Sequence, residues 1–157
     1  MREAIQAAQK SIYWELYIFY DDAPTHRFLD LLKERARAGV KVKIILDSLG
    51  SFQFFGNLQA DLKSHGIELL YFNRLLPWWN PHRFRRWWLL RTHRKMLIVD
   101  GRVGFVGGVN IGKKYQKWQD LHLRLEGGIV RRFVKAFSRS YRITGGRDRL
   151  YFPPKKN

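Results

Sequence analysis

Hydrophobic and polar positions alternate between two periods along the first half of the chain. Apolar runs rich in β-branched and aromatic residues predict strands at residues 11–20, 40–47 and 67–72. Residues 26–38 and 58–65 instead repeat apolar positions at helical spacing, and a glycine follows each segment. This β-α-β-α-β order predicts an α/β fold, with a mixed, largely parallel β-sheet flanked by helices. Functional residues are then expected at the carboxyl ends of the strands.

The second half of the chain predicts an antiparallel hairpin and a final helix. Residues 95–100 have the apolar pattern of a buried strand, and residues 102–106 have that of a return strand. The Asp100-Gly101 pair between them is a frequent two-residue hairpin turn. Residues 129–141 carry an apolar stripe at helical spacing, which indicates a helix packed on the core.

Length, charge and composition restrict the domain count and the partners. The 157 residues allow about one domain, which we place at residues 1–145, with residues 146–157 as a tail or linker. Thirty Lys and Arg against 13 Asp and Glu give a net charge of +17, which favours a polyanionic partner, either nucleic acid or an anionic bilayer. The absence of cysteine excludes a thiol nucleophile and thiolate metal sites. No apolar run approaches the roughly 18 residues of a transmembrane segment. The start lacks a signal-peptide pattern, which fits a cytosolic protein or a chain that begins inside a longer one.

Aromatic and basic residues are interleaved at residues 75–90, a stretch without Asp or Glu. Asn80-Pro81 is typical of a helix start, and this helix would place aromatic rings on one face with arginines beside it. That combination is typical of a helix lying at a membrane interface. We therefore assign membrane contact to Trp78, Trp79, Arg83, Arg86, Trp87 and Trp88. A core-packing insertion and a surface on which nucleic-acid bases stack are open alternatives.

The predicted hairpin is flanked by residue types that bind phosphate. His93 and Lys95 are two positions apart on the incoming strand, so both side chains project from one face. Asn110 follows Gly107-Gly108, whose bare backbone permits the close approach of a ligand. Imidazole is a competent nucleophile near neutral pH, while ammonium and amide groups hold charged oxygens. No acidic cluster accompanies them, so divalent-metal chemistry is disfavoured, and we expect neither a metal nor another cofactor.

These residues resemble the signature of the phospholipase D (PLD) superfamily, His-x-Lys-x4-Asp followed by Gly-Gly-x-Asn. The sequence meets it at His93, Lys95, Asp100, Gly107, Gly108 and Asn110. The chain is most similar to the N-terminal half of bacterial cardiolipin synthases, through Glu15 and through residues 47–51, 91–95, 118–120 and 123–127. The resemblance implies a PLD fold.

The resemblance also implies roles for the signature residues. His93 would be the nucleophile that forms a phosphohistidine, or its general-acid counterpart. Lys95 and Asn110 would bind the phosphoryl oxygens, and Asp100 would serve the catalytic motif as structural support. We assign substrate binding to Gly107, Gly108 and Ser51.

Two further carboxylates belong to the candidate site. Asp120 would orient the imidazole through its second nitrogen, or would be a solvated strand end. Glu15 is a lone carboxylate in an apolar strand and is paired either in the site or structurally. The remaining histidines, His122 among them, are expected at the surface.

The family builds one active site from two copies of the motif, and this sequence contains one copy. The second copy would come from a homodimer partner or from a missing half. We expect metal-independent phosphodiester transfer on anionic phospholipids through a phosphohistidine, as in a cardiolipin synthase-type phosphatidyltransferase or a phospholipase D. The protein would sit peripherally on the cytoplasmic side of the bacterial inner membrane. A dimeric nuclease acting on DNA or RNA, and an inactive half-domain that only binds anionic membrane, are the alternatives.

Overall fold

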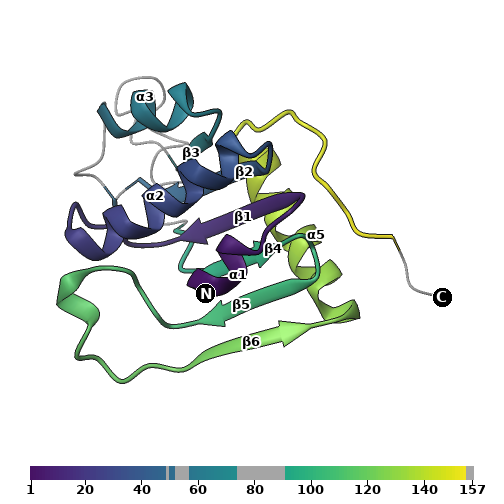
Figure 1. Cartoon of the computed structure of the whole chain (residues 1–157). Helices are drawn as coiled ribbons and strands as arrows, with labels where there is room; N and C mark the ends of the chain where they lie inside the picture. Colours follow the sequence, from purple (N-terminus) through teal and green to yellow (C-terminus); the bar gives the residue numbers. More distant parts are fainter. Residues whose placement is uncertain (49, 52–56, 74–90, 155–157) are drawn as a thin grey trace, which may run out of the picture.

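The computed structural model describes residues 1–48, 50–51, 57–73 and 91–154. Within these ranges, six strands form one sheet in the order β3-β2-β1-β4-β5-β6 (Figure 1). The strands are β1 (Ser11–Leu16), β2 (Lys41–Asp47), β3 (Glu68–Phe72), β4 (Met96–Val99), β5 (Val103–Gly107) and β6 (His122–Glu126). The helical elements are α1 (Arg2–Gln6), α2 (Ala23–Arg37), α3 (Asn57–Ser64), the 3-10 turn η2 (Lys113–Tyr115) and α5 (Gly128–Ile143).

The predicted α/β fold is confirmed, and its sheet is mixed. Parallel pairing joins β1 to β2 and β2 to β3, as the β-α-β-α-β order requires. The pairs β1–β4, β4–β5 and β5–β6 are antiparallel, so the parallel part of the sheet ends at β1. The turn between β4 and β5 is the predicted Asp100-Gly101 pair, and both residues have the positive φ of 52° and 58° that such a turn needs. The strand predicted at residues 11–20 ends earlier, at Leu16, because β2 ends and β4 begins at that level.

Helices cover both faces of the sheet. α1 and α2 lie on one face and α5 lies on the other (Figure 1). Side chains of β1 alternate between the two faces, and both sets are buried, which explains the nearly unbroken apolar run of this strand. Helix α2 begins where the Asp22 carboxylate accepts a hydrogen bond from the Thr25 amide at 3.1 Å.

The topology brings many strand ends to one side of the molecule. The carboxyl ends of β1, β2, β3 and β5 lie at the same edge as the amino ends of β4 and β6. We call this edge the carboxyl edge and the opposite one the amino edge. The carboxyl edge receives the segment before β4 and the loop after β5, which together contain most of the PLD-like motif.

The segment that the sequence assigns to a tail packs on the domain as far as it is described. Leu150 is buried on the α5 face, and the Tyr151 amide donates to the Tyr13 hydroxyl at 2.6 Å. The buried Lys43 ammonium contacts the Asp148 carboxylate at 2.6 Å and also the Glu68 carboxylate. These contacts hold the segment of residues 148–151 against β1 and β2.

Candidate active site

His93 and Lys95 form the centre of the carboxyl edge. The His93 side chain is exposed, whereas Lys95 is 5% exposed. The Lys95 ammonium lies 3.4 Å from Nε2 and 3.5 Å from Nδ1 of His93 and donates to the His93 carbonyl oxygen at 3.3 Å. Burial lowers the pKa of Lys95, and the charge of Asp120 opposes that shift. An accessible imidazole therefore stands directly beside a cation that the fold holds in place.

Tyr17, which the sequence interpretation missed, packs against this pair. Its ring centroid is 4.7 Å from that of His93, and the Lys95 ammonium lies 5.3 Å from the centre of the same ring. Ser51 is buried, and its hydroxyl donates to the Tyr17 carbonyl oxygen at 3.5 Å. This contact places Ser51 behind Tyr17. The sequence carries no signal for Tyr17, because the predicted strand runs to residue 20 and only the structure shows that β1 ends at Leu16, so that Tyr17 lies at the carboxyl edge.

The segment before β4 is held by buried carboxylates. Asp47, at the end of β2, accepts a hydrogen bond from the Thr92 amide at 3.2 Å and lies 3.6 Å from the Arg91 guanidinium. Glu15, at the end of β1, accepts hydrogen bonds from the hydroxyls of Thr92 at 2.5 Å and Ser140 at 3.1 Å. The residues immediately before His93 are thus fixed to two strands and to α5, which positions the imidazole although it lies outside a strand.

Glu15 faces α5, on the side of the sheet opposite to the apolar residues that pack under α1 and α2. Its side chain is fully buried, and its second carboxylate oxygen lies 3.9 Å from the Arg94 guanidinium. Burial raises the pKa of Glu15, and the bonds from Thr92 and Ser140 and the charge of Arg94 oppose that rise. The contacts give Glu15 a role in positioning the segment that carries His93.

The raised pKa of Glu15 predicts how stability depends on pH. The folded state holds the Glu15 proton more tightly than the unfolded chain does, so this stabilisation is complete below the unfolded pKa of about 4.3 and is lost as pH rises through the folded value. The wild-type free energy of unfolding should therefore fall with rising pH relative to that of Glu15→Gln. Chemical denaturation at a series of pH values measures the difference. Glu3→Gln, at an exposed site, is the control, and an equal slope in wild type and Glu15→Gln would contradict the prediction.

The two glycines of the motif bring β6 and Asp120 close to Lys95. The Gly107 amide donates to the Lys95 carbonyl oxygen at 3.4 Å, and the Gly108 amide donates to the Leu121 carbonyl oxygen at 3.0 Å. A Cβ on Gly108 would lie 2.0 Å from an Asp120 carboxylate oxygen, so this carboxylate rests directly on the Gly108 backbone. Asn110 follows on the same loop, and its buried Oδ1 has no hydrogen-bond partner within the described ranges.

His122 is not the surface histidine that the sequence predicts. Its ring is half-buried and stacks on Phe105 at a centroid distance of 6.5 Å, and both ring nitrogens are buried without a hydrogen-bond partner among the described residues. Burial lowers the pKa of His122, and the charge of Asp120 opposes that shift. The cause is the register, which places His122 opposite Gly107, where no side chain fills the space.

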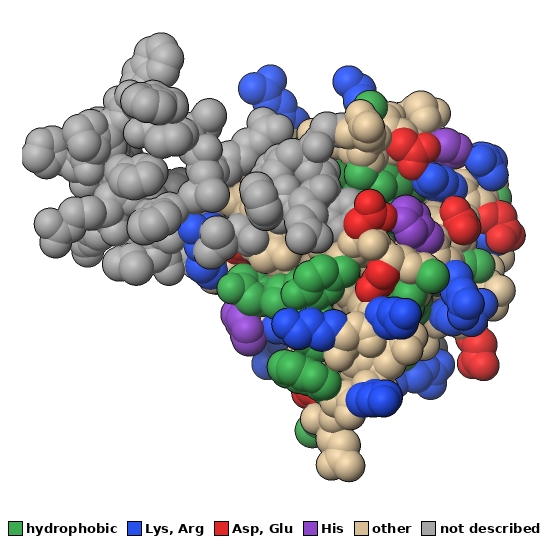
Figure 2. All heavy atoms as spheres, turned by 90° about the vertical axis from the view of Figure 1, so that its left-hand side faces the viewer, with side chains coloured by type: hydrophobic (Ala, Val, Ile, Leu, Met, Phe, Trp, Pro, Cys, Tyr) green, Lys and Arg blue, Asp and Glu red, His purple; other side chains and the backbone are tan. Residues whose placement is uncertain are grey.

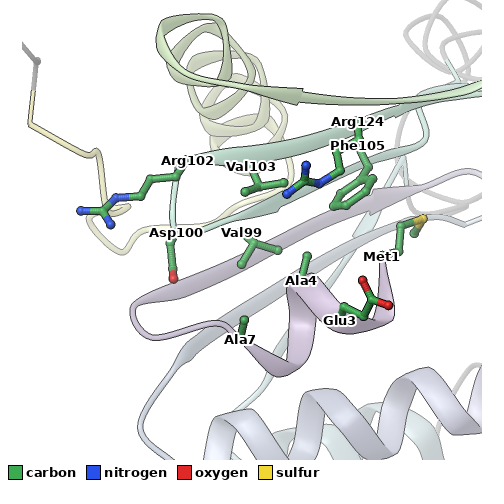
Figure 3. A pocket seen from close by; sticks show the side chains of 10 residues that line it. All are labelled: Met1, Glu3, Ala4, Ala7, Val99, Asp100, Arg102, Val103, Phe105 and Arg124. Atoms are coloured by element: carbon green, nitrogen blue, oxygen red, sulfur yellow. The ribbon is translucent and has the colours of Figure 1, made fainter.

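Asp100 is the motif residue that the fold places elsewhere. It lies at the other end of β4, on the amino edge, where its carboxylate accepts backbone hydrogen bonds from Gln9 at 2.9 Å, Lys10 at 2.7 Å and Ser11 at 2.8 Å. It also lines a cavity of about 380 Å³ between α1 and strands β4 to β6 (Figure 3). These bonds tie the hairpin turn to the start of β1, which favours the supporting role over proton transfer.

The residues to which the sequence assigns membrane contact lie outside the described ranges. These are Trp78, Trp79, Arg83, Arg86, Trp87 and Trp88, within residues 74–90.

The described residues also bear on the requirements of a metal site and of a membrane span. Within the described ranges, no group of three or more His, Asp or Glu side chains is arranged to hold a metal ion. No helix in the same ranges combines the length and apolarity needed to cross a bilayer.

Comparisons with known proteins identify the family and the fold of the chain. Residues 1–139 match the family model described as "Cardiolipin synthase, PLD-like domain". The chain is 35% identical over 135 residues to a probable cardiolipin synthase of Bacillus subtilis, which covers 82% of this chain and 26% of that protein. It is 34% identical over 149 residues to a cardiolipin synthase of Halalkalibacterium halodurans, with 90% and 29% covered. The fold resembles the crystal structure of Nuc, a phospholipase D family member from Salmonella typhimurium, with a TM-score of 0.64, 22% identity, and 97% of this chain and 88% of that chain covered.

The mixed six-stranded sheet and the family-model match over residues 1–139 define a PLD-like domain. The chain belongs to the family of cardiolipin synthase PLD-like domains. It spans less than a third of the length of the two curated relatives described above.

Proposed function

We propose that this chain supplies half of a phosphatidyl-transfer active site, with His93 as the nucleophile or its general-acid counterpart. The observation that carries the proposal is the exposed His93 imidazole with the Lys95 ammonium within 3.5 Å of both its ring nitrogens. A phosphodiester drawn to this cation comes within reach of the imidazole.

The proposed reaction has two displacement steps. A ring nitrogen of His93 attacks the phosphorus, the bond to the leaving alcohol breaks, and the leaving oxygen takes a proton from a second imidazole. That second imidazole then removes the proton of an acceptor alcohol or water, whose oxygen attacks the phosphohistidine and releases His93. Lys95 and Asn110 balance the charge on the phosphoryl oxygens, and Asp120 keeps the imidazole oriented.

The names of the relatives favour a phospholipid as the substrate. The curated relatives are cardiolipin synthases of which this chain covers 26% and 29%, so we place the second imidazole on a second copy of the chain or on a further part of a longer one. An acceptor such as phosphatidylglycerol would give phosphatidyl transfer, and water would give hydrolysis. We propose a peripheral position on the cytoplasmic side of the bacterial inner membrane, where the charge of +17 would meet anionic lipid.

Activity is expected to be independent of divalent metal, because the proposed steps use side chains alone. Phosphodiester transfer on phosphatidylglycerol vesicles should keep its rate in excess EDTA. The His93→Ala protein is the control for background activity. Loss of the wild-type rate in EDTA, with recovery on adding Mg²⁺ or Zn²⁺, would contradict the covalent-histidine mechanism. Faster cleavage of single-stranded DNA than of lipid in the same assay would favour the nuclease alternative.

A further inference from the structure

Exposed apolar side chains gather on the loop and strand next to the site. Trp118 is 62% exposed, Leu121 71% and Leu123 46%. The loop begins at the Gly107-Gly108 pair and ends at Asp120, so both of its ends belong to the candidate active site. Large apolar side chains exposed next to a site usually indicate a surface that binds a protein, a membrane or a ligand.

The loop presents Trp118 on a supported backbone. The Lys113 amide donates to the Asp22 carboxylate at 2.5 Å, which ties the loop to the start of α2. The Trp118 amide donates to the Tyr115 carbonyl oxygen at 3.0 Å, and the two rings meet edge to face at 5.1 Å. Tyr115 in turn packs on Tyr20 at a centroid distance of 5.8 Å. These contacts hold the loop in a conformation that leaves the indole of Trp118 exposed.

The positive charges around these apolar side chains favour an anionic bilayer over a protein as the partner. Lys113, Lys114 and Lys117 are on the same loop, whose sequence from residue 108 to residue 121 contains one acidic residue, Asp120, so the loop has an excess of positive charge. Lysine is depleted from the cores of protein–protein interfaces, whereas tryptophan and leucine next to lysine are typical of surfaces that enter the headgroup region of anionic bilayers. Figure 2 looks onto the carboxyl edge and shows hydrophobic side chains together with Lys and Arg side chains in its lower half.

We propose that this surface docks the domain on an anionic bilayer. We define the docking surface as Lys113, Lys114, Lys117, Trp118, Leu121 and Leu123. The indole and leucine side chains would enter the headgroup region while the lysines contact lipid phosphates. Because the loop starts and ends at the site, docking would bring His93 to the depth of the phosphodiesters. This proposal rests on the proposed function for its choice of lipid as substrate, but bilayer binding itself needs no catalysis.

Co-sedimentation with vesicles tests the docking surface. The wild type should bind vesicles of phosphatidylglycerol and phosphatidylcholine more tightly than vesicles of phosphatidylcholine alone. Trp118→Ser with Leu121→Ser should weaken binding by about tenfold or more. The matched control is Ile129→Ser, which removes an apolar side chain that is 40% exposed at the amino edge, and it should bind as the wild type does.

A second variant tests the docking surface through its charges, with exposed lysines changed in place of the aromatic and apolar side chains. Changing Lys113, Lys114 and Lys117 together to Gln should weaken binding to anionic vesicles by about tenfold or more. Its control changes the exposed residues Arg132, Lys135 and Arg139 of α5 to Gln, which removes the same number of charges from another surface.

The outcomes separate docking from catalysis. Unchanged vesicle binding by both docking variants would overturn the proposal. A variant that binds vesicles normally but no longer sediments as a dimer would also overturn it and would assign the surface to contact between copies of the chain. His93→Ala should bind vesicles as the wild type does. A wild type that binds vesicles and sediments as a dimer but transfers no phosphodiester would overturn phosphatidyl transfer by two copies of this chain and leave the docking surface standing.

Discussion

Mixing the His93→Ala chain with wild type is expected to lower phosphodiester transfer faster than the wild-type fraction falls. If each site needs one His93 from each of two chains, then only wild-type pairs are active. Random pairing of an equal mixture should then leave about one quarter of the activity. The pure His93→Ala protein should lose activity by on the order of 10⁴-fold or more, as expected when a nucleophile is removed.

The physical reason is the division of labour between two imidazoles. While one imidazole attacks phosphorus, a second group must protonate the leaving oxygen, and one ring cannot do both at once. Among the described residues, His122 also lies at the carboxyl edge, but its ring nitrogens are buried beside Gly107. His93, by contrast, is exposed at the carboxyl edge, where a second chain can reach it.

Sedimentation measurements of the same mixtures supply the control, because they show whether the chains pair and exchange. Changing the exposed His26 to Ala gives the matched variant, since it removes an imidazole on α2, and mixtures with it should keep full activity. A fall in activity that is strictly linear in the wild-type fraction would contradict the shared site. Full activity from a protein that sediments as a monomer would contradict it as well.

The sequence predicted the fold because its strongest patterns are local. The apolar runs, the helical spacing and the Asp100-Gly101 turn each determine their own segment, and the α/β class follows from their order. It also predicted that His93 and Lys95 lie together, but not how they are held. Both residues precede β4, which begins at Met96, and the segment that carries them is fixed by the hydrogen bonds from Thr92 to Asp47 and Glu15.

The sequence could not predict contacts that depend on packing between distant segments. Tyr17 meets His93 because β1 and β4 pair in antiparallel register, and a single sequence does not contain that register. Likewise, Glu15 contacts Thr92 because β4 pairs with β1, and it contacts Ser140 because α5 packs on β1. Hydrophobic patterning leaves such polar contacts undetermined, since each of these residues is also compatible with an exposed position.

Gly107→Ala is expected to destabilise the domain by about 3 kcal/mol. Gly108→Ala should change the free energy of unfolding little but should displace the Asp120 carboxylate. A Cβ on Gly107 would lie 2.1 Å from the Leu121 carbonyl oxygen and 2.7 Å from the His122 Cα. These are backbone atoms of the paired strand, so β5 and β6 would have to separate. At Gly108 the nearest atoms belong to the Asp120 carboxylate, the end of a side chain that can turn away, at the cost of its place beside the site.

Chemical denaturation of the two variants and of Gly128→Ala measures this difference. No atom lies within 4 Å of a Cβ built on Gly128, at the first position of α5, so Gly128→Ala should change the free energy of unfolding by less than about 0.5 kcal/mol. If Gly108→Ala folds with nearly wild-type stability but transfers phosphodiester at least about tenfold more slowly, then the Asp120 carboxylate acts in the site. Equal stability of Gly107→Ala and Gly128→Ala would show that β6 does not pair with β5 at this level. Wild-type transfer by a folded Gly108→Ala would remove Asp120 from the proposed mechanism.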